Sequence, residues 1–447
     1  MLRPHRRLTA PFLAAALVCG MAACSSTSSP TGTAAAATGG CQPAKGKVNL
    51  TYWSWIPGVN VAVNKFNATH PNIHVKLQMI TGGPPAYQSY FNALKAGTQP
   101  DLAMVEFDML PTMRFQNGLS NIADCAPVKD LAKQVLPWTY TQVTLDSKDV
   151  YATPTDTAPL ALYYRKDIFK KYGLAVPKTW AQYKADGEKL KKENPSIYLT
   201  SFDTQDDLML IGLDWQAGAR PFAFTGSDVT YDANSAAMNK VSDYWQSMID
   251  DKLVNTAIQP LTPAQYAGWS NGTLATLIGA TWDAGIMQGS AAKAKGKWAV
   301  APLPQWTPGA DASGNYGGAT TAVMAGSKYL YEDAVFAEWM STNLTATKII
   351  FGGGGIAANL AYDATGAIQA PQSYFGGQPI YDVFKQAGNN INHSFQWSPN
   401  QTDFDNYLTD DLTGAFNGTS TIAQAFAKAQ QSAAKDLEAQ GVSVVVK

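Results

Sequence analysis

Short segments in which apolar and polar residues alternate are followed along the chain by segments in which apolar residues recur with a helical period. In 59–69, Val59, Val63 and Phe66 fall on one face of a helix, which His70-Pro71 should end. Strands are predicted over 48–55, 73–80 and 101–105, and helices over 59–69, 86–95 and just before Gly118. This order predicts an α/β fold with a parallel sheet, whose ligand crevice lies at the carboxyl ends of the strands.

The rest of the chain continues the same alternation. Pro154 and Pro159 bound a segment that we expect to be a rigid, extended crossing. Thr179 precedes a helical pattern and is a predicted N-cap. Further strands are predicted over 150–154, 160–164, 197–202, 273–282 and 298–303, and further helices over 165–172, from 180 onward, and over 332–342 and 421–440.

The N-terminal segment has the pattern of an export signal. Arg3, Arg6 and Arg7 precede an apolar run over 10–23, which is too short to span a bilayer that needs ~20 residues. Met21-Ala22-Ala23-Cys24 resembles a bacterial lipobox, although an ordinary signal peptide remains an alternative. We therefore expect a signal peptide over 1–23, a lipid on Cys24, and anchoring to the outer face of the cell membrane through the polar tether of 24–46.

The composition argues against some classes of function and favours others. A chain of 447 residues favours two lobes rather than one core. Only 15% of the residues are charged and the formal net charge is −1, which gives no electrostatic argument for nucleic acid. With 12 Trp and 20 Tyr, the chain can offer an aromatic surface of low charge, which suits a neutral polyhydroxyl ligand. After export and lipidation Cys41 and Cys125 remain, and in an exported protein they favour a disulfide.

Several motifs in order resemble the family 1 extracellular solute-binding proteins, the class that contains maltose-binding protein. They are Leu50-Thr51-Tyr52-Trp53-Ser54-Trp55, Gly97-Thr98-Gln99-Pro100-Asp101, Tyr163-Tyr164-Arg165-Lys166-Asp167 with Pro177-Lys178-Thr179-Trp180, Gly279-Ala280-Thr281-Trp282, and Gly317-Gly318. The resemblance implies a two-lobed, hinge-joined binding-protein fold of type II. It also implies a monomeric receptor without catalytic residues, cofactor or metal, which carries a carbohydrate to the permease subunits of an ABC importer.

The resemblance also implies domain boundaries. Lobe 1 would comprise 47–153 and 301–344, and lobe 2 would comprise 154–300 and 345–447. The crossings between the lobes would lie near 151–156, 299–303 and 341–351.

Candidate sugar contacts are aromatic rings for the apolar faces of a sugar, and carboxylates for its hydroxyl groups. Trp53 and Trp55 end the first strand on the same side, and Glu106 and Asp108 follow the third strand. Trp282 is the foremost candidate, because it ends a predicted strand of small residues. The full set is Trp53, Trp55, Glu106, Asp108, Asp156, Trp215, Trp282, Asp283, Gly317, Gly318 and Trp397. Several of these aromatic residues could instead belong to the core.

Other motifs point to other functions, and we weigh them as alternatives. Gly268-Trp269-Ser270-Asn271-Gly272 matches a hydrolase nucleophile elbow, with His393 downstream, but the segment before it predicts helix or loop instead of a strand. His70 and His74 flank Pro71, which disfavours a shared metal-binding helix face. A secreted polysaccharide-degrading enzyme and a receptor for a non-sugar solute remain the alternative functions.

Overall fold

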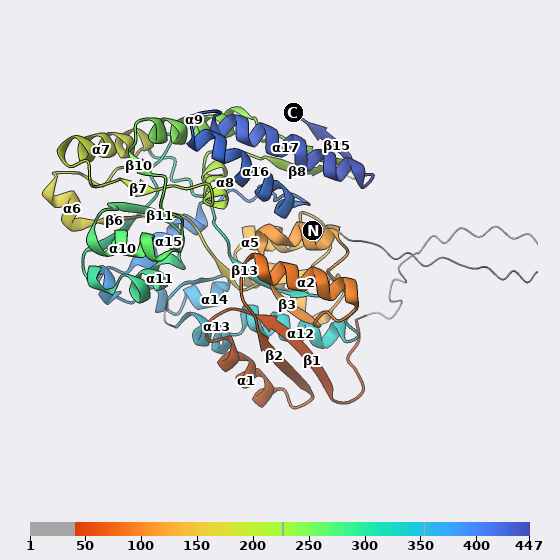
Figure 1. The fold of residues 1–447 in the computed structure, drawn as a ribbon. Helices are drawn as coiled ribbons and strands as arrows, with labels where there is room; N and C mark the ends of the chain where they lie inside the picture. The colour runs from red at the N-terminus through yellow and green to blue at the C-terminus, as the bar shows by residue number, and fades with distance from the viewer. Residues whose placement is uncertain (1–40, 226–227, 353) are drawn as a thin grey trace, which may run out of the picture. The chain divides into compact units, whose positions relative to one another are not determined.

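The computed structural model describes residues 41–225, 228–352 and 354–447. Its first sheet has the strand order β2-β1-β3-β13-β4 (Figure 1). The strands are β1 (Val48–Ser54), β2 (Ile73–Met79), β3 (Leu102–Glu106), β13 (Ala319–Val323) and β4 (Ala152–Pro154). β1 is parallel to β2 and β3, whereas β13 is antiparallel to β3 and β4. The prediction of a parallel sheet is therefore right for the first three strands and wrong for the sheet as a whole, because β13 enters from a distant part of the chain.

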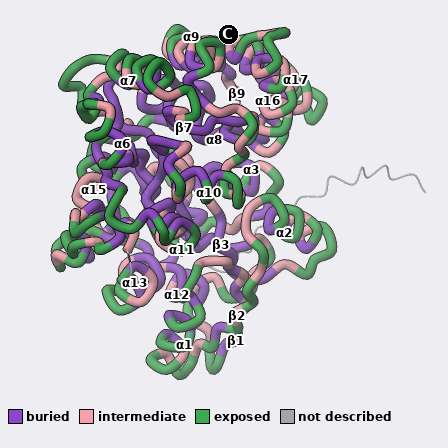
Figure 2. The backbone as a smooth tube through the Cα atoms, turned by 60° about the vertical axis from the view of Figure 1, so that its left-hand side comes forward, coloured by how far each residue is buried: buried purple, intermediate pink, exposed green. Residues whose placement is uncertain are grey.

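Helices cover this sheet on both faces. They are α1 (Val59–Thr69), α2 (Pro84–Ala96), α3 (Leu110–Phe115), α4 (Leu131–Gln134), α5 (Pro137–Thr144), α12 (Leu330–Thr342) and α13 (Leu344–Phe351). The buried residues of β1 alternate, so Tyr52 packs edge-on against Phe336 of α12 while Trp53 lies on the opposite face, against Tyr90 of α2. The outer turns of α1 and α2 are exposed in Figure 2, and β1 and β3 are mostly buried, whereas β2 at the edge of the sheet is largely exposed.

The second half of the fold contains smaller sheets. One has the order β11-β6-β12, another is the pair β10-β7, and a third is β15-β9-β8. The strands are β6 (Ala161–Arg165), β7 (Thr200–Ser201), β8 (Phe222–Thr225), β9 (Asp228–Tyr231), β10 (Val254–Asn255), β11 (Thr276–Gly279), β12 (Trp298–Ala301) and β15 (Ser443–Val446). Both β11 and β12 are antiparallel to β6, so the expectation of a parallel sheet at β11 is wrong.

Helices surround these sheets. They are α6 (Lys166–Lys171), α7 (Trp180–Glu193), α8 (Asp207–Gln216), α9 (Ala236–Asp250), α10 (Pro263–Asn271), α11 (Asp283–Ser290), α14 (Leu360–Asp363), α15 (Ile380–Asn389), α16 (Gln401–Phe416) and α17 (Ile422–Ala439). The predicted cap of α7 is confirmed, because the Thr179 side chain accepts a hydrogen bond from the backbone N–H of Gln182. None of the helices in the described ranges is long and apolar enough to cross a membrane.

The chain passes between the two sets of sheets through a few short segments. The first joins β4 to β6 and includes β5 (Asp156–Thr157). A second lies between β12 and β13, and a third follows α13 and includes β14 (Ile356–Ala357), which pairs with β5. The first and third crossings therefore lie side by side where β5 and β14 pair, and the second lies beside the first because the backbone N–H of Tyr316 donates to the Ala158 oxygen at 2.8 Å. This arrangement is typical of a hinge.

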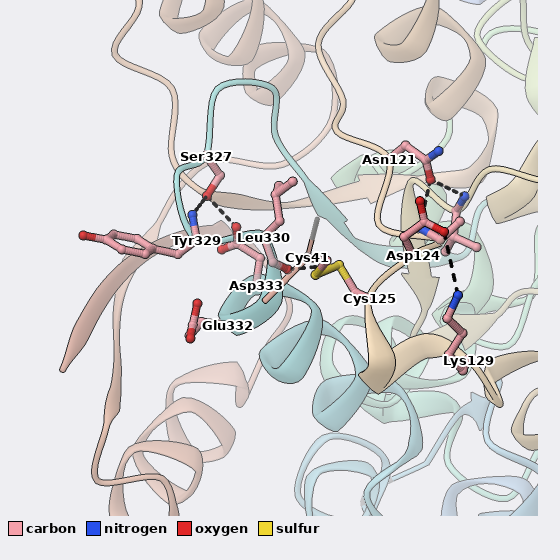
Figure 3. Close-up of a disulfide and its surroundings, with 12 residues drawn as sticks. Cys41, Asn121, Asp124, Cys125, Lys129, Ser327, Tyr329, Leu330, Glu332 and Asp333 are labelled. Atoms are coloured by element: carbon pink, nitrogen blue, oxygen red, sulfur yellow. Dashed lines mark hydrogen bonds and ion pairs between the residues drawn. A yellow bond between two sulfur atoms is a disulfide. The ribbon is translucent and has the colours of Figure 1, made fainter. Parts of the chain in front are cut away.

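A disulfide ties the start of the described chain to the first half. Cys41 and Cys125 are bonded, as the sequence predicts, with their Cα atoms 5.0 Å apart (Figure 3). The Cys125 sulfur also lies 3.6 Å from the backbone oxygen of Leu330, at the start of α12. Next to this bond the backbone N–H of Ala44 donates to Glu332 at 2.8 Å, so the segment after Cys41 is held against α12.

Candidate ligand-binding site

Three chain segments meet at the ends of the central strands of the first sheet. Glu106, the last residue of β3, pairs with Ala319, the first residue of β13. The side chain of Asp156 in β5 accepts a hydrogen bond from the backbone N–H of Ala319. The backbone N–H of Phe107 donates to Gly318 at 3.1 Å. Residues far apart in the sequence, Glu106, Asp156 and Gly318, are thus adjacent beside the crossings.

Glycine is required where these segments meet. Gly317 and Gly318 have φ of +88° and +100°, values that other residues rarely adopt. A Cβ atom on Gly318 would lie 2.8 Å from the Phe107 ring, and one on Gly317 would lie 3.6 Å from the indole nitrogen of Trp282. The backbone at Gly318 therefore packs closely against the Phe107 ring, and the backbone at Gly317 lies close to the Trp282 ring.

Trp53 and Trp55 lie on the same side of β1, as their alternation predicts. Trp53 stacks on Tyr90 and Trp55 packs edge-on against Tyr87, each pair with centroids 6.1 Å apart. The Tyr87 hydroxyl donates to Glu106 Oε2 at 2.9 Å and accepts from the Glu106 backbone N–H at 3.1 Å. Both tryptophans are partly buried, so each retains some exposed surface.

The second half contributes Trp282 and Asp283. The carboxyl end of β11, Gly279, pairs with Ala161 at the amino end of β6, which comes directly from the first crossing. This antiparallel pairing, and not a parallel sheet, is what brings Trp282 to the crossings. Its Nε1 donates to the backbone oxygen of Tyr316 at 3.1 Å, and the two rings pack edge-on with centroids 5.2 Å apart. Trp282 is partly buried.

Carboxyl groups from both halves raise one another's pKa values, in addition to the effect of burial. We call them the carboxylate cluster, which comprises Glu106, Asp108, Asp156, Asp206, Asp207, Asp283 and Asp405. Burial raises the pKa of the Tyr316 hydroxyl, and the charges of Asp206, Asp283, Asp207 and Glu106 raise it further.

Burial is the main cause of the pKa shifts in the cluster. It raises the pKa of Asp283 to about 8, with a smaller contribution from the charge of Asp206. Burial likewise raises the pKa values of Asp156, Asp206 and Asp207 to about 7. Several of these groups therefore change protonation near neutral pH, which is typical of functional sites.

Comparison with known proteins identifies the family. The family of bacterial extracellular solute-binding proteins matches residues 52–344. The chain belongs to this family. Because its members are extracellular binding proteins, the protein is an exported solute-binding protein and not an enzyme.

Individual relatives carry more specific names. An arabinooligosaccharide-binding protein of Bacillus subtilis is 28% identical over 64% of this chain and 67% of its own length. A lactose-binding protein of Rhizobium radiobacter is 24% identical over 77% of this chain and 83% of its own length. Among solved structures, an ABC-transporter-associated binding protein from B. animalis subsp. lactis in complex with β-1,6-galactobiose superposes with a TM-score of 0.79. It is 26% identical and covers 89% of this chain and 100% of its own.

Two predicted contacts pack inside the solute-binding protein. Trp215 is 1% exposed, stacks on Phe395 at 4.2 Å, and donates its Nε1 to the backbone oxygen of Asn392 at 2.8 Å. Trp397 is also 1% exposed and packs edge-on against Phe395 and Trp215. In this structure both indoles are covered by protein, so neither offers a free ring face to a ligand.

Sequence reasoning missed Tyr87, Tyr316, Asp206, Asp207 and Asp405. Asp206 and Asp207 come soon after the strand β7, in the same way that Glu106 and Asp108 come at the end of β3. An acidic run just after a strand was therefore an available signal. Asp405 lies inside α16, where acidic residues recur as they do on an ordinary solvent-exposed helix face. The sequence therefore gives no sign that the charges of Asp207 and Asp108 raise its pKa.

The competing motifs take other structural roles. Gly268–Asn271 lies within α10, and Gly272 ends that helix with φ of +88°, so Ser270 is on a helix and not on a strand-to-helix elbow. His393 is exposed. His70 ends α1 and stacks on Phe66 at 4.0 Å. Among the described residues, no group of three or more His, Cys, Asp or Glu is arranged to hold a metal ion.

Proposed function

We propose that the protein captures an oligosaccharide between its two lobes and delivers it to the permease subunits of an ABC importer. One observation supports this proposal: aromatic rings and carboxyl groups from both lobes lie together beside the crossings. Trp53, Trp55 and Trp282 would cover the apolar faces of sugar rings, and Glu106, Asp108, Asp156 and Asp283 would bind hydroxyl groups. Backbone at Gly317 and Gly318 would approach the ligand closely. The names of the relatives, which bind arabinooligosaccharide, lactose and β-1,6-galactobiose, support an oligosaccharide.

The proposal includes closure about the crossings. A ligand that touches both lobes favours the closed arrangement over an open one, because only the closed form makes both sets of contacts. The predicted boundaries, 47–153 with 301–344 and 154–300 with 345–447, remain our proposal for the moving lobes except at the third crossing. There α13 packs against α1 and α12, so we assign this helix to the first lobe and place the boundary after it. Trp215 and Trp397 would then act as packing residues that keep the second lobe rigid.

The proposal also includes a lipid anchor. Met21-Ala22-Ala23-Cys24 and the predicted tether up to residue 40 lie outside the described residues, so the argument for acylation of Cys24 comes from the sequence alone. The prediction that the tether extends to residue 46 is wrong, because Cys41 and Ala44 are bonded to the fold. An anchored monomer on a tether would stay near its permease while its lobes close freely.

The test combines calorimetry with small-angle scattering on the mature protein. The panel contains lactose, β-1,6-galactobiose, lacto-N-biose and arabinooligosaccharides. We expect at least one of them to bind and to reduce the radius of gyration at saturation. Glu106→Gln should weaken that binding, whereas Asp410→Asn, on the exposed face of α16, should not. A panel without binding, or binding without compaction, would contradict capture by closure.

A further inference from the structure

The start of helix α2 is fixed by its sequence. Pro84 and Pro85 are its first two residues, where proline is well tolerated, and Gly83 precedes them with φ of +70°. Tyr87 therefore lies at the end of the first turn and is 7% exposed. Its ring packs edge-on against the Tyr90 ring, with centroids 5.9 Å apart. The Tyr87 side chain is thus held in the core of the first lobe.

The hydroxyl group of Tyr87 makes two hydrogen bonds, both with Glu106. It donates its hydrogen to Glu106 Oε2 at 2.9 Å and accepts from the Glu106 backbone N–H at 3.1 Å. A tyrosine hydroxyl has a single hydrogen to donate, so it has none left for a ligand. Because the two bonds join the carboxylate and the backbone of the same residue, they limit the rotamers that the Glu106 side chain can adopt.

The Glu106 carboxylate is held by Tyr87 and not by an ion pair. None of the ion pairs among the described residues involves Glu106. The Tyr87 hydroxyl occupies Oε2, which leaves Oε1 for a ligand. Glu106 is partly exposed whereas Tyr87 is buried, so the carboxylate is more accessible to a ligand than the hydroxyl that holds it.

Tyr87 also contacts Trp55. The two rings pack edge-on, with centroids 6.1 Å apart. The backbone at Gly82 packs against the same indole, because a Cβ atom on Gly82 would lie 2.6 Å from Trp55 Cδ1. Both contacts limit the positions that the indole can adopt. Tyr87 therefore touches two of the residues that would bind the sugar, one aromatic and one acidic.

We propose that Tyr87 is a positioning residue of the sugar site, which directs the Glu106 carboxylate toward a hydroxyl group of the sugar and does not contact the sugar itself. This inference rests on the proposed function and adds to its site a residue that is buried in the first lobe. A glutamate side chain that is ordered before binding loses less conformational entropy when the ligand arrives. The Tyr87 hydroxyl should therefore contribute to affinity through Glu106.

Removal of the hydroxyl group alone tests this role without a ligand. Tyr87→Phe keeps the ring and its contacts with Trp55 and Tyr90, and it removes both hydrogen bonds to Glu106. Crystal structures of the unliganded proteins should show Glu106 in one rotamer in the wild type, and in another or in several rotamers in the variant. An unchanged Glu106 carboxylate in the variant would overturn the inference, whether or not the protein binds a sugar.

Calorimetry measures the consequence for affinity. The probes are lactose, β-1,6-galactobiose, lacto-N-biose and arabinooligosaccharides, and Tyr87→Phe should weaken each one that the wild type binds by roughly tenfold. Tyr407→Phe is the matched control, because the Tyr407 hydroxyl also donates to a carboxylate, Asp436 Oδ2, at 2.7 Å. This control should keep wild-type affinity. Wild-type affinity in Tyr87→Phe would overturn the inference, whereas a wild type that binds none of the probes would contradict the proposed function and leave the crystal structures to judge Tyr87.

A double-mutant cycle shows whether the hydroxyl acts through Glu106. Glu106→Ala removes the carboxylate, so the further change Tyr87→Phe should then alter affinity by less than about twofold, compared with roughly tenfold when Glu106 is present. Equal losses in both backgrounds would show that the hydroxyl acts through another group, such as Trp55, and the inference would then be wrong.

Discussion

Replacing Trp282 by alanine tests the site most directly. The change removes the Nε1 hydrogen bond to the Tyr316 backbone and the edge-on contact with the Tyr316 ring. Each is worth about 1 kcal/mol, so the free energy of unfolding should fall by about 2 kcal/mol. This is less than the 3–5 kcal/mol typical of a tryptophan fully buried in a core, because Trp282 is only partly buried.

The effect on binding should be at least as large. An aromatic anchor on a sugar face removes apolar surface from water and excludes solvent from the neighbouring hydrogen bonds. By analogy with interface hot spots its loss costs about 2 kcal/mol or more, which is about 30-fold in affinity. Trp282→Phe keeps a ring but loses the hydrogen bond, and it should recover part of the lost affinity.

The assay measures affinity by calorimetry and stability by chemical denaturation on the same samples. Trp245→Phe is the matched control, because Trp245 is 0% exposed and packs between Phe202 and Trp180 in the core. The control should lose stability and keep its affinity. If Trp282→Ala also keeps its affinity while it loses stability, then Trp282 is a core residue and the reasoning about the site is wrong.

Further predictions concern stability and anchoring. Asp214 is 0% exposed, neither carboxyl oxygen has a partner among the described residues, and burial raises its pKa well above the usual value. As pH rises, Asp214 ionises in the unfolded protein before it ionises in the folded one, so the aspartate lowers the stability of the fold more at pH 7 than at pH 4. In denaturation curves, Asp214→Asn should therefore stabilise the protein increasingly between pH 4 and 7. A pH-independent effect would refute this. Cys41→Ser with Cys125→Ser opens a disulfide that spans 84 residues and should cost up to about 4.5 kcal/mol in the same assay, whereas an unchanged midpoint would contradict a structural bond. Cys24→Ala should release the protein from the membrane fraction, and unchanged fractionation would exclude the anchor.

Local chemistry made much of the fold predictable from the sequence. The helix predicted over 59–69 is α1, because its apolar spacing and the His70-Pro71 stop act within a few residues. The Thr179 cap is likewise a local hydrogen bond. The predicted strand over 273–282 is shorter in the structure, as β11 covers only Thr276–Gly279, since strand ends depend on the neighbouring strand and not on the residues themselves.

The tertiary structure alone decided which residues meet at the site. The sequence pointed to Glu106, Asp156 and Trp282 one at a time, because each follows or precedes a strand. Nothing local indicates that Asp405, within a helix near the end of the chain, lies close to Asp207 and Asp108. Nor does anything local distinguish Trp215, which packs against Phe395, from Trp282, which stays partly exposed. Strand order, strand direction and burial arise from contacts between distant segments, so the set of residues that meets at the candidate site became apparent only in the folded protein.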